Sequence, residues 1–259
     1  MAEENATIKV TILGSGTSTG VPAIGCDCPV CSSHDPRDKR TRASILLTLE
    51  GANVLIDTST DLRYQALKNG IKRLSAVFFT HAHADHVHGI DELRSFNFLQ
   101  QEAIPCYGDK ETLKRIKTMF AYIFREQRHG GGIPKLTLHE MSGDLQLLGR
   151  KFIPVEVLHG ELPVLGYRVA NMAYVTDCSE IGPASMEKLR GLDLLILGAL
   201  RHRPHATHFS LSEALEVVEA LKPRRTLFTH MGHEVSYIKT SAELPEGVEL
   251  AYDGMTAVI

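Results

Sequence analysis

Short apolar segments with many β-branched residues recur along the chain, separated by polar residues and glycines. Their lengths are typical of β-strands, which in such patterns run for roughly four to eight residues. They predict strands at residues 8–13, 45–49, 54–56, 76–79, 151–157, 166–169, 172–175, 194–197, 226–228 and 248–251.

Helical periodicity appears in three stretches between these strands. The first, residues 62–67, ends at Asn69-Gly70, because glycine is common just past the last turn of a helix. The second is an apolar stripe over residues 113–123, and the third covers residues 211–221 with Pro223 beyond it. Strands come first and then alternate with helices, which predicts an α/β sandwich rather than a doubly wound sheet.

The chain of 259 residues has a globular composition, with 43% hydrophobic and 23% charged residues. It holds 28 basic and 31 acidic residues, and its net charge is −3 with histidine neutral. This weak acidity argues against a non-specific nucleic-acid binder, which normally carries a basic surface, although a local basic patch is compatible with it. The absence of a signal-peptide pattern and of a long apolar run predicts a cytoplasmic protein without a membrane span.

The strongest functional signal is the sequence Thr-His-Ala-His-Ala-Asp-His at residues 80–86, directly after a predicted strand. Four imidazole or carboxylate groups so close together are not core packing, because each buried polar head needs its own partner. At a strand end, His81 and His83 are placed to face one cation. Asp85 and His86 are placed to face another. These ligand types suit zinc, manganese or iron.

Three further candidates, His159, Asp177 and His230, have the same placement just past the end of a predicted strand. Sites gather at strand ends in sheet-based α/β folds. Because the motif alone supplies too few ligands for two cations, these three residues are predicted to complete both half-sites.

The motif and the three residues that follow it resemble the metallo-β-lactamase superfamily, over nearly the whole chain from Gly14-Ser15-Gly16-Thr17 to Tyr252-Asp253-Gly254-Met255. The resemblance implies an αβ/βα sandwich with a two-metal centre in a cleft. It implies two divalent ions, manganese or zinc with iron as an alternative. The implied ligands are His81, His83 and His159 for one ion, Asp85, His86 and His230 for the other, and Asp177 as a bridge.

A cysteine cluster, Cys26, Cys28 and Cys31, lies within residues 17–42, a stretch with so little periodicity that it predicts an unusually long loop. Loops of that length normally need a functional reason or a cross-link. In a cytosolic chain such a cluster indicates a metal site more readily than a disulfide framework. We therefore predict a single domain over residues 1–259, with a zinc-stapled loop at about 17–42.

Three thiolates need a fourth ligand to complete a tetrahedral structural zinc site. Cys106 and Cys178 lie on or beside predicted strands and are interpreted as small buried side chains. His233, three residues after His230, is the better candidate. A zinc ion held by three cysteines and His233 would tie the long loop to a segment that supplies an active-site ligand.

The CxCxxC pattern, with a histidine three residues past the last active-site histidine, resembles the PhnP-type phosphodiesterases. Those enzymes act in phosphonate catabolism and open a ribosyl 1,2-cyclic phosphate. PqqB, a protein of PQQ synthesis, has a similar cysteine cluster, whereas the tRNA 3′-processing nucleases generally lack it. Aspartate rather than cysteine among the second-metal ligands also resembles the phosphodiesterases more than the lactamases.

His208 stands immediately before the third predicted helix. In the phosphodiesterase and tRNA-nuclease branches, a histidine at the matching position lies close to the metals. The resemblance implies that His208 stabilises phosphoryl oxygens or protonates the leaving alkoxide, and its alternative role is to cap the helix. His202 and His205 are interpreted as solvated or cleft-rim groups. Arg201 and Arg203 either meet a substrate phosphate or are solvated.

The leading hypothesis is a metal-dependent phosphodiesterase acting on a small cyclic or ribosyl phosphodiester, in which a metal-bridging hydroxide attacks phosphorus. Asp85 and Asp177 orient the nucleophile and His208 assists the leaving oxygen. A tRNA 3′-processing endonuclease is a second hypothesis, disfavoured because no basic inserted arm is present. A non-hydrolytic, PqqB-like accessory protein is a third, disfavoured by the complete ligand set. Substrate choice is assigned to loops at 96–105 and 125–134, and a homodimer is the default assembly.

Overall fold

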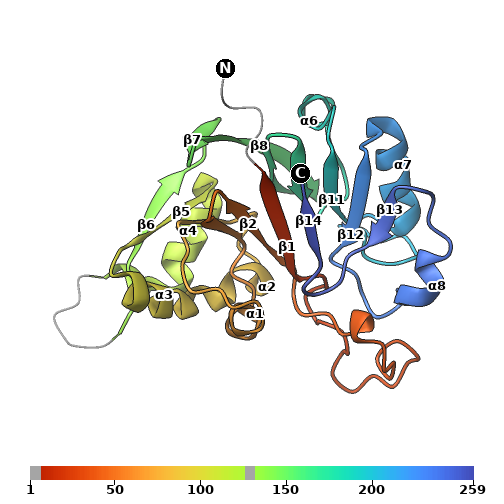
Figure 1. The fold of residues 1–259 in the computed structure, drawn as a ribbon, viewed down its shortest axis with the longest axis horizontal. Coiled ribbons are helices and arrows are strands. Elements are labelled where there is room, and N and C mark those ends of the chain that lie inside the picture. The colour runs from red at the N-terminus through yellow and green to blue at the C-terminus, as the bar shows by residue number, and fades with distance from the viewer. Residues whose placement is uncertain (1–6, 126–131) are drawn as a thin grey trace.

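Most strands carry apolar side chains on both faces, so each needs cover on two sides. All five residues of β11 (Leu194–Gly198), for example, are buried. The computed structural model describes residues 7–125 and 132–259. It shows two sheets packed face to face, with helices covering both outer faces (Figure 1). The predicted αβ/βα sandwich is confirmed.

Each sheet contains seven strands. The first sheet has the order β14 (Thr256–Val258), β1 (Ile8–Gly14), β2 (Ser44–Leu49), β3 (Ala52–Ile56), β4 (Ala76–Phe78), β5 (Ile104–Gly108) and β6 (Leu136–Glu140). The second has the order β13 (Val248–Leu250), β12 (Arg225–Thr229), β11, β10 (Met172–Val175), β9 (Leu162–Val169), β8 (Arg150–His159) and β7 (Leu145–Leu147). Strands β3 to β6 run parallel to one another, as do β10 to β13, and the remaining neighbours are antiparallel.

The helices are short, and they cover the two outer faces. They are α1 (Leu62–Lys68), α2 (Ala84–Val87), α3 (Leu93–Gln100), α4 (Lys110–Met119), α5 (Ala121–Phe124), α6 (Pro183–Lys188), α7 (Leu211–Leu221) and α8 (Tyr237–Ser241), with 3-10 turns at Pro36–Asp38 and His88–Glu92. Leu62, Leu93 and Ile116 pack on the outer face of the first sheet. Leu211 and Ala214 of α7 pack on the outer face of the second.

Aromatic side chains join the two sheets in the core between them. The ring of Phe78, from the first sheet, stacks on Phe152 of the second with 4.6 Å between centroids. It meets the edge of Tyr167 at 5.1 Å. The buried Tyr167 hydroxyl donates a hydrogen bond of 2.6 Å to the Phe79 carbonyl. This contact spans the sandwich two residues before the His-rich motif begins at His81.

Every strand predicted from the sequence is present, and the largest difference is in β9, which begins at Leu162, four residues earlier than predicted. The sequence prediction missed β5, β6, β7 and β14, and the expected helix over 113–123 is interrupted at Phe120, where φ is −110° and ψ is 41°. The expected loop at 96–105 is wrong, because α3 continues to Gln100 and β5 begins at Ile104. Within the other expected loop, 125–134, residues 126–131 lie outside the described part of the chain.

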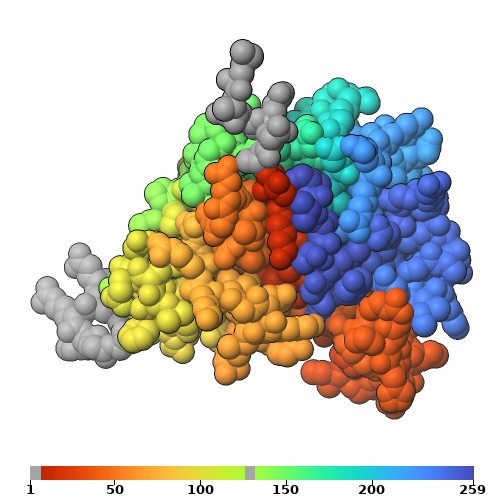
Figure 2. All heavy atoms as spheres, viewed as in Figure 1, coloured from red at the N-terminus to blue at the C-terminus, as the bar shows by residue number. Residues whose placement is uncertain are grey.

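Residues 17–42 form the predicted long loop, which projects below α8 in Figure 1 and lies against C-terminal residues in Figure 2. The side chain of Arg40 is fully buried and anchors this loop. Its guanidinium donates to the carbonyls of Gly232 and Val235 and pairs with Asp38. The Asp38 carboxylate also accepts a hydrogen bond of 2.8 Å from the Tyr237 amide.

Within the described residues, no helix is both long enough and apolar enough to cross a membrane.

We expect Tyr167→Phe to lower the free energy of unfolding by about 1 kcal/mol, because it removes a buried hydrogen bond between the sheets. Tyr174→Phe is the matched control, since the equally buried Tyr174 hydroxyl makes no hydrogen bond of normal geometry with any described residue. Urea unfolding followed by circular dichroism measures both changes. Equal stability of the two variants would contradict this account of the core.

Candidate metal centre

The His-rich motif occupies the turn between β4 and α2, at the carboxyl end of a parallel strand. His81 and His83 lie in the turn, and His83 is the N-cap of α2. Asp85 and His86 lie in the first turn of that helix, where His86 is fully buried. The second sheet contributes His159, the last residue of β8.

Asp177 and His230 reach the same place from the ends of β10 and β12. Both have left-handed backbones, with φ of 49° for Asp177 and 57° for His230. Residues other than glycine seldom adopt this conformation, and it is found where the surrounding structure holds a functional side chain in place.

Asp177 lies between two groups of ligands. Its Oδ1 atom is 3.1 Å from Nε2 of His230 and 3.4 Å from Nε2 of His86. Its Oδ2 atom is 3.8 Å from Nε2 of His81. Because the two carboxylate oxygens face different histidines, Asp177 is placed to contact two cations.

Asp85 completes the group formed by His86, His230 and Asp177. Its Oδ2 atom is 3.3 Å from Nε2 of His86 and 3.5 Å from Nε2 of His230. His81 and His83 group with Asp177 in the same way. His159 stands close to both, with ring centroids 5.1 Å from His83 and 5.8 Å from His81.

The residues fit divalent metal ions, because several buried polar atoms at this point have no hydrogen-bond partner among the described residues. These orphaned atoms are Nε2 of His81, His86 and His230, and Oδ2 of Asp85. Leaving such atoms unpaired costs about 1–3 kcal/mol each, more for a charged group, and a shared cation removes that cost. Imidazole nitrogen and carboxylate oxygen are the donors expected for zinc, manganese or iron.

The pKa shifts of the candidate ligands also favour bound positive charge. Burial alone would lower the pKa of His86, but the carboxylates around it raise that pKa well above its usual value. Burial alone would raise the pKa of Asp177, but His230 and His86 hold it well below the usual value. Burial lowers the pKa of His81, which favours the neutral imidazole that ligates metals.

Asp57 is a functional residue that the sequence reasoning missed. It is fully buried at the end of β3 with φ of 66°, and its Oδ2 accepts a hydrogen bond of 2.7 Å from Nδ1 of His86. The same carboxylate accepts from the Thr80 amide and hydroxyl, each at 2.8 Å. The Thr80 oxygen in turn lies 2.9 Å from Nδ1 of His81. Asp57 thereby directs Nε2 of both histidines into the site.

The signal for Asp57 was present in the sequence. It follows the predicted strand 54–56 directly, as His81, Asp177 and His230 follow theirs.

His208 lies beside the metal centre, as the sequence predicted. Its Nδ1 is 4.0 Å from Oδ2 of Asp177, and its ring is 4.5 Å from that of His159. Burial lowers the pKa of His208 to about 3. Its expected alternative role is not observed, because Ser210 caps α7 through a capping box with Glu213.

The loop before α7 is held on both sides. His159 donates from Nδ1 to the Thr207 carbonyl at 2.7 Å, which leaves its Nε2 for a cation. Arg203 forms a two-pronged ion pair with Glu234, at 2.8 and 3.2 Å, rather than facing the site.

The sequence left open the roles of three more residues in this loop, and each of them makes a different contact. Arg201 donates to the carbonyls of Arg203 and Pro204. His202 meets the Thr240 hydroxyl at 3.3 Å. His205 has its ring 5.2 Å from that of His208, which agrees with a cleft-rim position.

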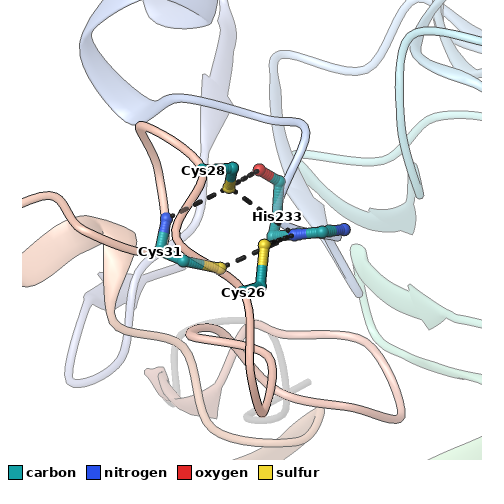
Figure 3. A group of neighbouring side chains, drawn as sticks. All are labelled: Cys26, Cys28, Cys31 and His233. Carbon is teal, nitrogen blue, oxygen red and sulfur yellow. Dashed lines mark hydrogen bonds between the residues drawn. The ribbon is translucent and has the colours of Figure 1, made fainter.

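The predicted second site also assembles. Nδ1 of His233 lies 3.1 Å from Sγ of Cys26, 3.6 Å from Sγ of Cys28 and 3.5 Å from Sγ of Cys31 (Figure 3). Zinc bonds of about 2.3 Å to sulfur and 2.0–2.1 Å to nitrogen, in a tetrahedron, place such atoms about 3.6 Å apart. The cluster therefore has the donors and spacing of a structural zinc site.

The thiols of this cluster differ in acidity. The amide of Cys31 donates to Sγ of Cys28 and lowers the pKa of that thiol to about 6. Burial raises the pKa of the Cys31 thiol to about 11. The remaining cysteines of the chain, Cys106 and Cys178, are buried, as expected.

Comparison with known proteins agrees with the fold and the site. A family model described as the beta-lactamase superfamily domain matches residues 52–231. The chain belongs to the metallo-β-lactamase superfamily, whose fold implies divalent metal ions. Within it the chain is PhnP-like: a solved structure described as a new diphosphatase from the PhnP family has 45% identity and a TM-score of 0.92, over 98% of this chain and 97% of that one.

Two curated relatives carry other names. The octanoyltransferase of Porphyromonas gingivalis is 37% identical over 257 residues, which are 97% of this chain but 52% of that protein. The chain thus spans about half the length of this relative. Coenzyme PQQ synthesis protein B of Methylobacterium radiotolerans is 35% identical over 229 residues, 75% of this chain and 74% of that protein.

We expect Asp57→Asn to weaken divalent-metal affinity about 10–100-fold, because the neutral amide no longer fixes the imidazoles of His81 and His86. Competition with a chromophoric chelator measures that affinity. Asp144→Asn is the control, since Asp144 forms an ion pair with Lys151 at the surface and belongs to none of the candidate ligand groups. Unchanged affinity in Asp57→Asn would show that this carboxylate does not organise the site.

Proposed function

We propose that this metallo-β-lactamase-fold hydrolase is a metal-dependent phosphodiesterase, acting on a small cyclic or ribosyl phosphodiester. The observation that carries the proposal is the position of Asp177, with one carboxylate oxygen toward His81 and the other toward His86 and His230. A carboxylate shared in this way serves a two-metal centre better than a single-ion site.

In this proposal the ligands divide as the family resemblance implies. One divalent ion would be held by His81, His83 and His159. The other would be held by Asp85, His86 and His230, with Asp177 shared between the two. The ions are manganese or zinc, with iron as an alternative, and Cys26, Cys28, Cys31 and His233 hold a structural zinc. When bound, two such cations supply an activated water near neutral pH and neutralise charge on phosphoryl oxygens.

The chain's own groups position the reactants. The carboxylates of Asp85 and Asp177 accept hydrogen bonds from the attacking water and so orient it toward phosphorus. His208, which lies close enough to His159 and Asp177 to form a candidate ligand group with them, donates a ring N–H to a phosphoryl oxygen or to the leaving oxygen in this proposal. Its ring is held between His159 and His230, at centroid distances of 4.5 and 5.0 Å.

Hydrolysis of a diphosphate linkage is a second candidate activity, supported by the 45% identical relative described as a diphosphatase. Each phosphorus of a diphosphate diester is attacked by water in the same way as the phosphorus of a phosphodiester. The site therefore needs no additional catalytic group for this reaction. Cleavage of tRNA is less well supported, because the net charge is −3 and Arg203 is paired with Glu234. The name octanoyltransferase belongs to a protein twice as long, and acyl transfer has no counterpart in the site described above.

We expect protein loaded with manganese or zinc to hydrolyse bis-p-nitrophenyl phosphate, and Asp85→Ala to abolish this activity because it removes a ligand and orienting carboxylate. Release of p-nitrophenolate measures the rate. Asp193→Ala is a matched control, since Asp193 precedes β11 at the end of the sheet opposite the site. Turnover of a thioester or a β-lactam without diester hydrolysis would refute the proposal, and cleavage of a 3′-extended tRNA precursor would favour the nuclease.

We expect His208→Ala to lower kcat by about 10²–10³-fold, the usual loss when a hydrogen-bond donor to the charge developing in the transition state is removed. The metal content should stay at the wild-type value. His202→Ala, in the same loop but bonded to Thr240, should retain activity. Loss of metal from His208→Ala, measured by elemental analysis, would instead assign His208 as a ligand.

A further inference from the structure

A cavity of about 160 Å³ adjoins the first ligand group. It is bounded by the motif, by the start of α4 and by the hairpin of β8 and β9. Its lining residues are His81, Ala82, His83, Asp109, Glu111, Thr112, Arg115, Glu156, Leu162, Pro163, Val164 and Leu165. None of the residues that line it from α4, β8 or β9 belongs to the proposed metal ligands.

The wall formed by β9 is apolar over four consecutive residues, from Leu162 to Leu165. The Leu165 amide donates a hydrogen bond of 3.0 Å to the Thr80 carbonyl, directly before the motif. This bond fixes the apolar wall relative to His81 and His83, which also line the cavity. A group bound in this cavity could belong to the same small substrate molecule as a phosphate held at the metal centre.

The polar residues around the cavity are mostly acidic. Asp109, Glu111 and Glu156 face a single cation, Arg115. The Arg115 guanidinium is already paired with Glu111, at 3.2 Å between Nε and Oε1. The lining residues therefore offer no unpaired cation for a second phosphate, and the apolar wall favours an uncharged group.

We propose that this cavity is a substrate subsite for an uncharged, ring-sized organic group esterified to the phosphate. The inference rests on the proposed function, because the phosphate is placed at the ligand groups beside the cavity. The size is sufficient, since an apolar cavity of about 150 Å³ binds benzene in another protein. Because a larger apolar group buries more surface against the apolar wall, an aromatic or otherwise weakly polar ring is favoured over a methyl group.

The same features disfavour a polynucleotide as the natural substrate. A nucleic-acid chain would bring a further phosphate to each side of the reacting one, and one of them would meet a cavity with an apolar wall and no unpaired cation among its lining residues. The subsite therefore selects a small diester with one compact neutral group.

The test compares the affinities of phenyl phosphate and methyl phosphate for the metal-loaded protein, measured by isothermal titration calorimetry. These probes share the phosphate and differ only in the organic group. We expect phenyl phosphate to bind at least tenfold more tightly, because burial of an aromatic ring is worth about that much or more.

Two variants fill the cavity from different strands: Pro163→Trp and Glu156→Trp, both at exposed positions. Each should reduce the phenyl-to-methyl affinity ratio to near one. Glu161→Trp is the matched control, because Glu161 is exposed next to β9 and does not line the cavity, and it should keep the wild-type ratio. Affinity for inorganic phosphate reports the metal site separately.

Equal affinities of the two esters for the wild-type protein would overturn the subsite, as would an unchanged ratio in both tryptophan variants. Failure of the proposed function has a different signature, namely absence of diester hydrolysis by the loaded wild-type protein. The binding measurement needs no turnover, so the two outcomes are distinguishable.

Discussion

The hydrogen bonds accepted by the buried carboxylate of Asp57 are the constraint on which the site depends. They reach His86 directly and His81 through Thr80, so one side chain sets the ring orientation of a histidine in each ligand group. A buried carboxylate is costly unless its hydrogen bonds are made, and the bond from His86 is made only when that imidazole presents Nε2 to the site. The fold and the chemistry are thus coupled through a single residue at the end of β3.

A second constraint comes from the polypeptide backbone on the other side of the site. Asp177 and His230 have left-handed conformations at the ends of β10 and β12. The segment after His230 is held by the cysteine cluster at His233 and by buried Arg40, which bonds the carbonyls of Gly232 and Val235. The long loop therefore supports a strained ligand position rather than merely covering the surface.

Much of this architecture could be predicted from the sequence, because buried strands and metal ligands leave strong local patterns. The central strands are continuous apolar runs, and seven ligand-type residues follow strand ends. Strands β6 and β7 were missed because they are partly exposed and only weakly apolar. Asp57 was missed because a lone aspartate before threonine and serine also suits an ordinary turn. The cavity beside His83 was beyond prediction, since its walls come from β9 and α4, which are distant in sequence.

The pairing of β14 with β1 has a consequence for synthesis of the protein. Val10 lies opposite Ala257, so the partner of this edge is made only after nearly all the intervening chain has emerged from the ribosome. Until then β1 offers an unpaired edge, the kind of surface through which nascent chains associate wrongly. Completion of the first sheet therefore waits until β14 has been translated, and chaperone dependence during translation is the expected cost of this topology.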